Sequence, residues 1–349
     1  MSKSVTKGIR IFVLITVLTS IVMLFFTVSE ETWRSLEKIK PIYFLIALVL
    51  LLAYYYLDGL RIKLLADALG YKISVMTGID VVVGGIFLAA VTPFQSGGYP
   101  FQVYCLNKRG IPYGEGTLIL FMRGVLAIFF HIAALPFIFV TYSSLLENSI
   151  VKWLIRYIMV LYPVMLLIAI IAIAFPGKVV SFMMAIDRKF NKNAGKNQSK
   201  LAKAANWIDT EIKLFKNGLV FYFTKRRASL FINLALTFIG YILFFSLAAV
   251  ILYALGAGMK NPVAIASLQF LHNFLVYFTP TPGASGIAEA LFAILFKDIC
   301  PKEILGLYAI IWRFFTFTIG ACIGGFLTLK IVNQSGTTLD ELMKDEKGK

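Results

Sequence analysis

The chain has 349 residues, of which 59% are hydrophobic and only 15% are charged. Soluble domains are about 45–50% apolar, so a water-soluble fold of this length would leave much apolar surface in water, and lipid must cover that surface instead. The formal net charge of +16 would suggest a nucleic-acid partner for a soluble protein, but here the basic residues gather between apolar segments. The composition therefore predicts an all-α polytopic membrane protein with no nucleic-acid partner.

Sequence signatures of metal binding and of catalysis are lacking. The three cysteines are far apart and form no C-x-x-C or Cys/His spacing, so neither a disulfide framework nor a zinc site is indicated. There is also no G-x-S-x-G, P-loop or H-E-x-x-H motif. We expect no cofactor, no metal and no catalytic residue.

Six segments are apolar over roughly the 20 residues that a membrane-crossing helix needs, or nearly so. They are 9–29, 41–57, 117–141, 151–175, 229–255 and 303–330. The first follows basic residues, as the apolar core of a signal peptide does, but it has no small-residue cleavage site and is followed by Glu30 and Glu31. It is interpreted as a retained first transmembrane helix.

Two further apolar stretches are interrupted by proline and glycine. The stretch 79–105 is broken from Thr92 to Pro100, and the stretch 262–297 is broken from Thr279 to Gly286. Proline removes a helix donor and glycine favours open backbone, so each stretch predicts two short helical arms around an irregular apex. Such an apex survives at membrane depth only if it is buried in protein or lines a watery cavity. We expect two re-entrant helical hairpins.

The basic residues between the apolar segments predict the orientation. Segments 1–10, 58–78, 106–116, 176–228 and 330–349 carry 24 Lys and Arg, whereas 30–40, 142–152 and 256–302 carry 7. This bias predicts a multi-pass protein of the cell membrane with both termini in the cytoplasm. The first hairpin then enters from the cytoplasm and the second from outside.

The expected domain organisation is two membrane halves, 1–175 and 229–331, with a basic cytoplasmic linker at 176–228 and a polar tail at 332–349. In the linker, apolar residues from Leu201 to Phe215 recur every three or four positions among lysines. This pattern fits an amphipathic helix on the anionic leaflet. A solvated linker between the halves fits equally well.

The two halves resemble each other. In each, a span precedes a Thr-Pro break and a later span carries an arginine, Arg123 or Arg313. Glu115 and Glu289 each lie between break and arginine, at different offsets. Two such units in opposite orientation are typical of transporters, whose substrate sites form where broken helices meet near the midplane. Coincidence is the alternative, because Thr-Pro is a common dipeptide.

Arg313 lies about 15 Å into its span at 1.5 Å per residue. An arginine near the bilayer centre costs roughly 2.5–3.5 kcal/mol on insertion scales and is a functional candidate by default. Its guanidinium suits a phosphate, and the alternative is a structural ion pair with Glu289. Glu289 in turn is either a helix cap or arginine partner, or a titrating coupling group. Arg123 lies nearer the cytoplasmic end, where reaching the interface is easier.

The remaining candidate substrate-binding residues belong to the breaks or to the arms beside them. The glycines suggest either backbone amides open to an anionic headgroup or close hairpin packing, and the polar side chains suggest a polar path, although a histidine here is more often a packing residue. These candidates are Gly97, Gly98, Gln95, Thr279, Pro280, Pro282, Gly283, Gly286, Gln269 and His272.

The second break carries a family resemblance. Thr279-Pro-Thr-Pro-Gly-Ala-Ser-Gly-Ile-Ala-Glu289, followed by Trp312-Arg313, resembles the transmembrane, flippase-like region of lysylphosphatidylglycerol synthases. The match around Thr92-Pro93 and Arg123 is weaker but in the expected place. The resemblance covers essentially the whole chain and implies a stand-alone domain that moves a lipid, such as an aminoacylated phosphatidylglycerol, between leaflets. Fused relatives continue into a soluble aminoacyl-transfer domain, for which this chain has no residues.

Three functions remain open at this point. The first is a flippase-like transporter of an anionic or aminoacylated phospholipid. The second is a membrane enzyme or enzyme subunit of lipid modification, of the phosphatidylglycerol lysyltransferase type or for glycosyl transfer from a polyprenyl phosphate, with a separate transferase as partner. The third is a structural or assembly protein. The expected partners are membrane lipids, either an anionic phospholipid or a polyprenyl-phosphate lipid.

Overall fold

The computed structural model describes residues 37–141, 200–258, 261–276, 279 and 281–335, with single positions at 21 and 156. Helices make up this part of the chain, and it contains no strand. Among the described residues, four helices are long and apolar enough to cross a membrane: Pro41–Ala68, Tyr113–His131, Arg227–Ala254 and Lys302–Thr328. They coincide with four of the six predicted spans. The other two, 9–29 and 151–175, lie outside the described residues.

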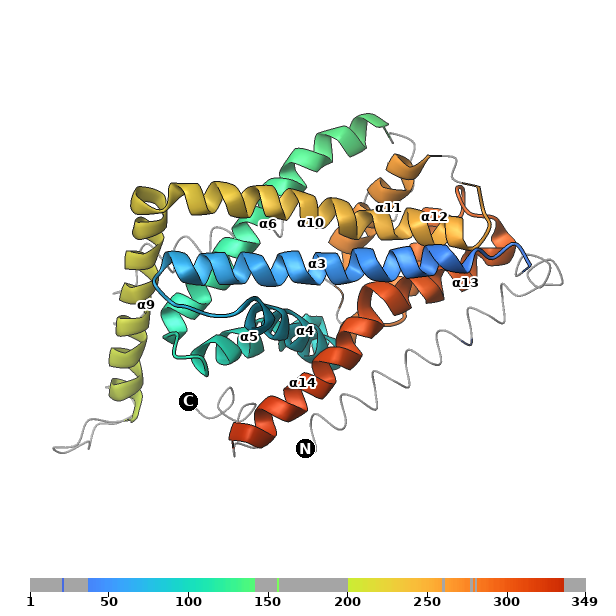
Figure 1. Ribbon diagram of the computed structural model, residues 1–349. Coiled ribbons are helices and arrows are strands. Elements are labelled where there is room, and N and C mark those ends of the chain that lie inside the picture. Colours follow the sequence, from blue (N-terminus) through green and yellow to red (C-terminus); the bar gives the residue numbers. More distant parts are fainter. Residues whose placement is uncertain are drawn as a thin grey trace.

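Two long helices, α3 (Pro41–Ala68) and α10 (Arg227–Ala254), form the antiparallel centre of the fold (Figure 1). The Lys40 N–H donates to Ala254 O at 2.8 Å at one end, and the Ser229 hydroxyl donates to Leu64 O at 3.4 Å at the other. Large apolar side chains remain exposed along both helices. Examples are Ile42, Leu45, Val49, Leu52, Phe231, Ile232, Ile239 and Ile242. Lipid is the solvent that such faces need.

A helix–turn–helix unit follows each of these two helices. After α3 come α4 (Val75–Val91), the 3₁₀ turn η1 (Pro93–Gln95) and α5 (Gly98–Asn107). After α10 come α11 (Pro262–Val276), the 3₁₀ turn η3 (Pro282–Ala284) and α12 (Ile287–Phe296). Because α3 and α10 are antiparallel, the two units start from opposite ends of the fold. The helix–break–helix pattern of both stretches is thus as predicted.

Each unit is followed by another helix, α6 (Tyr113–Thr141) or α13 (Lys302–Arg313). Helix α13 continues through a π-helical turn, η4 (Phe314–Thr318), into α14 (Ile319–Ser335). π-Helical turns are rare and frequently mark functional sites, and this one begins directly after Arg313. Helix α14 packs closely on α4, since a Cβ at Gly324 would lie 1.9 Å from Val83 O.

Helix α9 (Lys200–Lys225) occupies the second part of the segment that the sequence analysis treats as a linker. In Figure 1 it runs across the ends of α3 and α10 rather than along them. The Tyr222 hydroxyl, fully buried, donates to Leu65 O at 2.6 Å, and Glu211 accepts from the Gly114 N–H at 2.6 Å. The helix is therefore docked on the ends of α3 and α6.

Candidate functional site

The turns of the two units meet. η1 and η3 pack against each other, and η3 also packs on α4. A Cβ at Gly283 would lie 3.2 Å from Ala90 Cα, and the φ of Gly283 is +56°, so glycine suits this close approach. In the described part of the chain, the non-glycine residues with positive φ are Phe94, Gln95 and Ala284, all of them in these turns. Such backbone costs about 1–3 kcal/mol per residue and clusters at functional sites.

Arg313 is the charged centre beside this junction. Its side chain is about 6% exposed, and its Nε lies 3.4 Å from Glu289 Oε1. Its Nη2 donates to the carbonyl of Gly283 in η3, and its guanidinium lies 4.2 Å from the ring centroid of Phe317. The other oxygen of Glu289 accepts from the Gly286 N–H at 2.7 Å, which caps α12. Both the predicted cap and the predicted ion pair are present.

A cavity of about 70 Å³ opens next to Arg313. Its lining comes from η1, α10, α11, α13 and η4: Gln95, Phe244, His272, Asn273, Val276, Trp312, Arg313, Thr316 and Phe317. The structure thus brings three predicted residues, Gln95, His272 and Arg313, to one cavity. His272 Nε2 donates to Ala288 O at 2.7 Å, and its ring stands edge-on to Trp312 at 4.5 Å.

Buried polar atoms without a hydrogen bond concentrate here. Within the described residues they include Arg313 Nε, Glu289 Oε1, His272 Nδ1, Trp312 Nε1 and Thr281 Oγ1. Native proteins pair more than nine-tenths of such atoms. The ion pair between Arg313 and Glu289 is close enough for attraction but is not a hydrogen bond. This centre retains donors and an acceptor for a polar group that enters it.

Other predicted residues make contacts within the fold. The Gln269 amide, fully buried, accepts from Ala248 N and donates to Phe244 O, so it joins α11 to α10. The Thr279 hydroxyl donates to Val276 O at 2.9 Å. The Gly97 N–H donates to Thr92 Oγ1 at 2.9 Å, and a Cβ at Gly98 would lie 2.8 Å from Gly85 O. Pro282 begins η3, and Pro280 lies outside the described residues.

Arg123 belongs to a second charged cluster. Its Nε lies 3.3 Å from Asp58 Oδ1, and its Nη1 donates to Gln102 Oε1 at 3.3 Å. Arg61 donates to the same Asp58 oxygen at 2.8 Å and to the carbonyl of Arg123 at 2.9 Å. Asp58 and Arg61 are 2% and 4% exposed. The sequence assigned these two residues to a loop, but α3 continues to Ala68 and buries them.

Glu115 and Glu289 both lie between a break and an arginine, but they do not occupy corresponding places in the structure. Glu115 accepts a hydrogen bond from the Tyr71 hydroxyl, and burial together with this contact raises the pKa of Tyr71 to about 12. Gln102 is the residue that corresponds to Glu289, because it lies on the helix after the break and contacts the arginine of its unit. The equal separation of Pro93 from Gln102 and of Pro280 from Glu289 is the signal that reveals this match.

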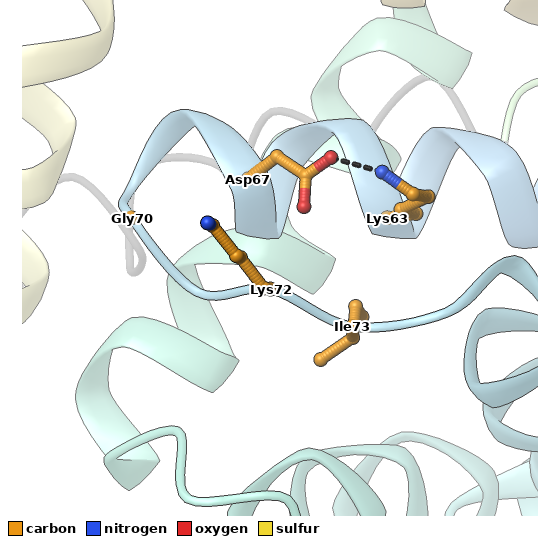
Figure 2. A pocket seen from close by; sticks show the side chains of 5 residues that line it. All are labelled: Lys63, Asp67, Gly70, Lys72 and Ile73. Atoms are coloured by element: carbon orange, nitrogen blue, oxygen red, sulfur yellow. Dashed lines mark hydrogen bonds and ion pairs between the residues drawn. The ribbon is translucent and has the colours of Figure 1, made fainter.

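A larger hollow of about 440 Å³ lies at the far end of α3. Lys63, Asp67, Gly70, Lys72 and Ile73 line it, and Figure 2 shows Lys63 turned toward Asp67 on the same helix while Lys72 projects from the following loop. It contains none of the buried charged residues. The buried ion pair, the polar atoms without a hydrogen bond and the residues with positive φ all lie at the junction of η1 and η3. The smaller cavity is therefore the candidate site.

These features define a multi-pass α-helical membrane protein built around two broken helical units that meet beside a buried arginine–glutamate pair. The chain belongs to the family described as the lysylphosphatidylglycerol synthase TM region, whose model matches residues 12–324. The resemblance carried by the second break is thereby confirmed.

Two archaeal relatives are similar along nearly their whole length. A UPF0104 membrane protein of Archaeoglobus fulgidus is 25% identical over 319 residues, which cover 87% of this chain and 91% of the relative. A UPF0104 membrane protein of Methanocaldococcus jannaschii is 20% identical over 342 residues, which cover 96% and 97%. No solved structure matches.

Proposed function

We propose that this protein is a flippase-like transporter that moves an anionic or aminoacylated phospholipid between leaflets. The headgroup passes the junction of η1 and η3, and the acyl chains stay in the surrounding lipid. The observation that carries the proposal is this junction, where two broken helices from opposite ends of the fold meet beside the buried Arg313. Membrane transporters place their substrate sites at such meetings of broken helices.

The chemistry of the junction suits a phospholipid headgroup. The guanidinium of Arg313 offers planar donors to a phosphate. Glu289 Oε1 is buried without a hydrogen bond in the described part of the chain, and it is suited to accept the ammonium of an aminoacyl group. An arginine alone would favour any anion, whereas the pair favours a headgroup that carries both charges. Lysylphosphatidylglycerol has this character, and the family description supports it as a candidate.

The proposed placement in the membrane follows from the positive-inside bias. We infer that the ends of α3 and α10 covered by α9 face the cytoplasm and that the other ends face outward across the cell membrane. The unit α4–η1–α5 is then re-entrant from the cytoplasm, and α11–η3–α12 from outside. Exposed Lys225, Arg226 and Arg227 lie at the α9 end of the fold, in agreement with this orientation.

Translocation in proteoliposomes tests the function. Labelled phosphatidylglycerol, lysylphosphatidylglycerol and phosphatidylcholine are compared for the wild type, Arg313→Ala and Arg313→Lys. We expect faster movement of at least one of the first two lipids than in protein-free vesicles. Arg313→Ala abolishes it, and Arg313→Lys retains part, since lysine keeps the charge but loses the fork. Lys297→Ala, in an exposed loop, is the matched control and retains wild-type rates.

Failure of the wild type to move any of the three lipids would refute the transport proposal for these substrates. A folded Arg313→Ala variant with wild-type rates would refute the role assigned to Arg313. The lipid-modifying enzyme and the separate transferase stay predictions, and no observation at the junction favours them over transport.

A further inference from the structure

The buried ion pair of the junction is electrically neutral. Among the described residues, Arg313 and Glu289 form an ion pair only with each other, and their side chains are 6% and 4% exposed. A phosphodiester headgroup that enters beside Arg313 brings one negative charge, so the three groups together are negatively charged. A buried charge is costly unless it is paired. A headgroup with no positive charge of its own therefore has to enter together with one.

The two oxygens of Glu289 differ in their contacts. Oε2 accepts from the Gly286 N–H at 2.7 Å and caps α12, so a proton on this oxygen would weaken the cap. Oε1 is buried without a hydrogen bond from a described residue and lies 3.4 Å from Arg313 Nε, which is itself a buried donor with no acceptor in that part of the chain. Arg313 Nε is therefore a donor left for a phosphate oxygen, and Glu289 Oε1 is the group beside it.

The charge of Glu289 Oε1 decides whether it opposes or assists a phosphate at that donor. An ionised carboxylate only accepts hydrogen bonds, and its negative charge repels a phosphate oxygen that approaches the same N–H. A protonated carboxyl has an O–H donor, which can point at the phosphate oxygen that Arg313 Nε binds. One proton on Oε1 thus removes the excess negative charge and adds a hydrogen bond to the headgroup.

The ionisable groups around Glu289 are few. The turn η3 has none, α11 presents His272, and α13 presents Arg313 and, further along α12, Tyr308. The remaining charged residues of α13 lie in its first turn, far from Arg313. His272 lines the same cavity as Arg313, so a proton on its Nδ1 would place a second cation beside the guanidinium. A proton on Glu289 instead removes a negative charge where the anion arrives.

We propose that an anionic headgroup enters the junction together with one proton, taken from water on the side of entry and held on Glu289 Oε1, and that both leave on the other side. The protein is then a proton–lipid symporter for headgroups without a positive charge. This inference rests on the proposed function and adds the ion that is moved with the lipid. A headgroup that carries an ammonium needs no proton, because the ammonium pairs with the Glu289 carboxylate.

The test is proton uptake on binding, measured without transport. Purified protein in nanodiscs of phosphatidylcholine, in weak buffer with a pH indicator, is titrated with short-chain phosphatidylglycerol and, separately, with short-chain phosphatidylethanolamine. We expect uptake of about one proton per bound phosphatidylglycerol at pH 7 and none for phosphatidylethanolamine. By linkage, binding of phosphatidylglycerol tightens as the pH falls, by up to about tenfold per pH unit.

Glu289→Gln provides the neutral side chain without a proton to gain. We expect this variant to bind phosphatidylglycerol with no proton uptake and with an affinity that does not depend on pH. Asp298→Asn, an exposed acid just after α12, is the matched control and keeps the proton uptake of the wild type. His272→Gln keeps it as well.

Binding of phosphatidylglycerol by the wild type without proton uptake would overturn the inference. Uptake that persists in Glu289→Gln and disappears in His272→Gln would overturn the assignment to Glu289. If Glu289→Gln does not fold, the two lipids decide, because equal uptake for both contradicts the charge argument. A wild type that takes up a proton with the lipid but does not flip it fails the proposed function alone, whereas flipping without proton uptake fails this inference alone.

Discussion

The pair of Arg313 and Glu289 allows structural and functional roles to be separated in one experiment. The variants are Arg313→Gln, Glu289→Gln and the double substitution. At 3.4 Å and an effective dielectric constant of about 20, the attraction is about 5 kcal/mol before desolvation. Removing one partner of a buried pair leaves an uncompensated charge and costs about 3–5 kcal/mol. The double variant has no such charge, so its free energy of unfolding should fall by less than the summed losses of the two single variants.

The assay is equilibrium unfolding in mixed micelles, followed by circular dichroism. We expect a coupling free energy of about 2 kcal/mol, within the range for contacting residues. Lys63→Gln, Asp67→Asn and their double variant form the control cycle. That pair is 31% exposed on both sides, so its coupling should be below about 1 kcal/mol.

If the loss of unfolding free energy in the double variant equals the sum of the two single losses within about 0.5 kcal/mol, the ion pair is refuted. The function of the pair is tested on the same proteins. If the double variant recovers stability but moves no lipid, the two charges serve the substrate as well as the fold. If it recovers both, their role is structural.

Three further predictions follow from the packing and the topology. Gly324→Ala should destabilise the protein strongly, because its Cβ would meet Val83 O at 1.9 Å. Gly124→Ala is the control: a Cβ there has no neighbour within 4 Å among the described residues, so this variant should stabilise α6 by up to about 1 kcal/mol. Similar melting temperatures for the two variants would contradict this prediction. Tyr222→Phe should cost about 1 kcal/mol and speed proteolysis within α9, since it removes the bond to Leu65 O; unchanged proteolysis would show that α9 is held by other contacts. In a Cys322→Ser background, where Cys105 and Cys300 are buried, an impermeant maleimide should label Asn217→Cys from the cytoplasmic side and Asp298→Cys from outside, and labelling of both from one side would refute the inferred topology.

Much of the fold was predictable from local signals. Long apolar runs mark α3, α6, α10 and α13–α14, because each must satisfy its own backbone in lipid. Proline and glycine mark η1 and η3, because these residues interrupt the backbone hydrogen bonds of a helix. The π-helical turn at Phe314–Thr318 has no comparable signal, since no proline or glycine interrupts it. The relation between α3 and α10 is a tertiary contact, which periodicity does not encode.

The charged residues of the candidate site were predictable, and the pairing of Arg313 with Glu289 was one of the predicted alternatives, but the cluster around Arg123 was not predicted. Arg313 and Glu289 are conspicuous because charge is rare in an apolar segment. Asp58 and Arg61 follow an apolar run that is already long enough to cross the bilayer, so they were assigned to the loop. Their burial depends on Arg123, which is 62 residues from Arg61 in the sequence. Gln102 is one of several glutamines that could line a polar path, and nothing in the sequence singled out its contact with Arg123.

The central claim is that a lipid headgroup enters the junction between the two broken units. Phosphatidylglycerol with a photoactivatable headgroup, cross-linked in proteoliposomes and mapped by peptide mass spectrometry, tests it most directly. The account predicts adducts on the cavity lining around Gln95, His272 and Trp312, reduced by excess unlabelled lipid and absent in Arg313→Ala. Adducts confined to the lipid-facing residues of α3 and α10, with none at the junction, would contradict it.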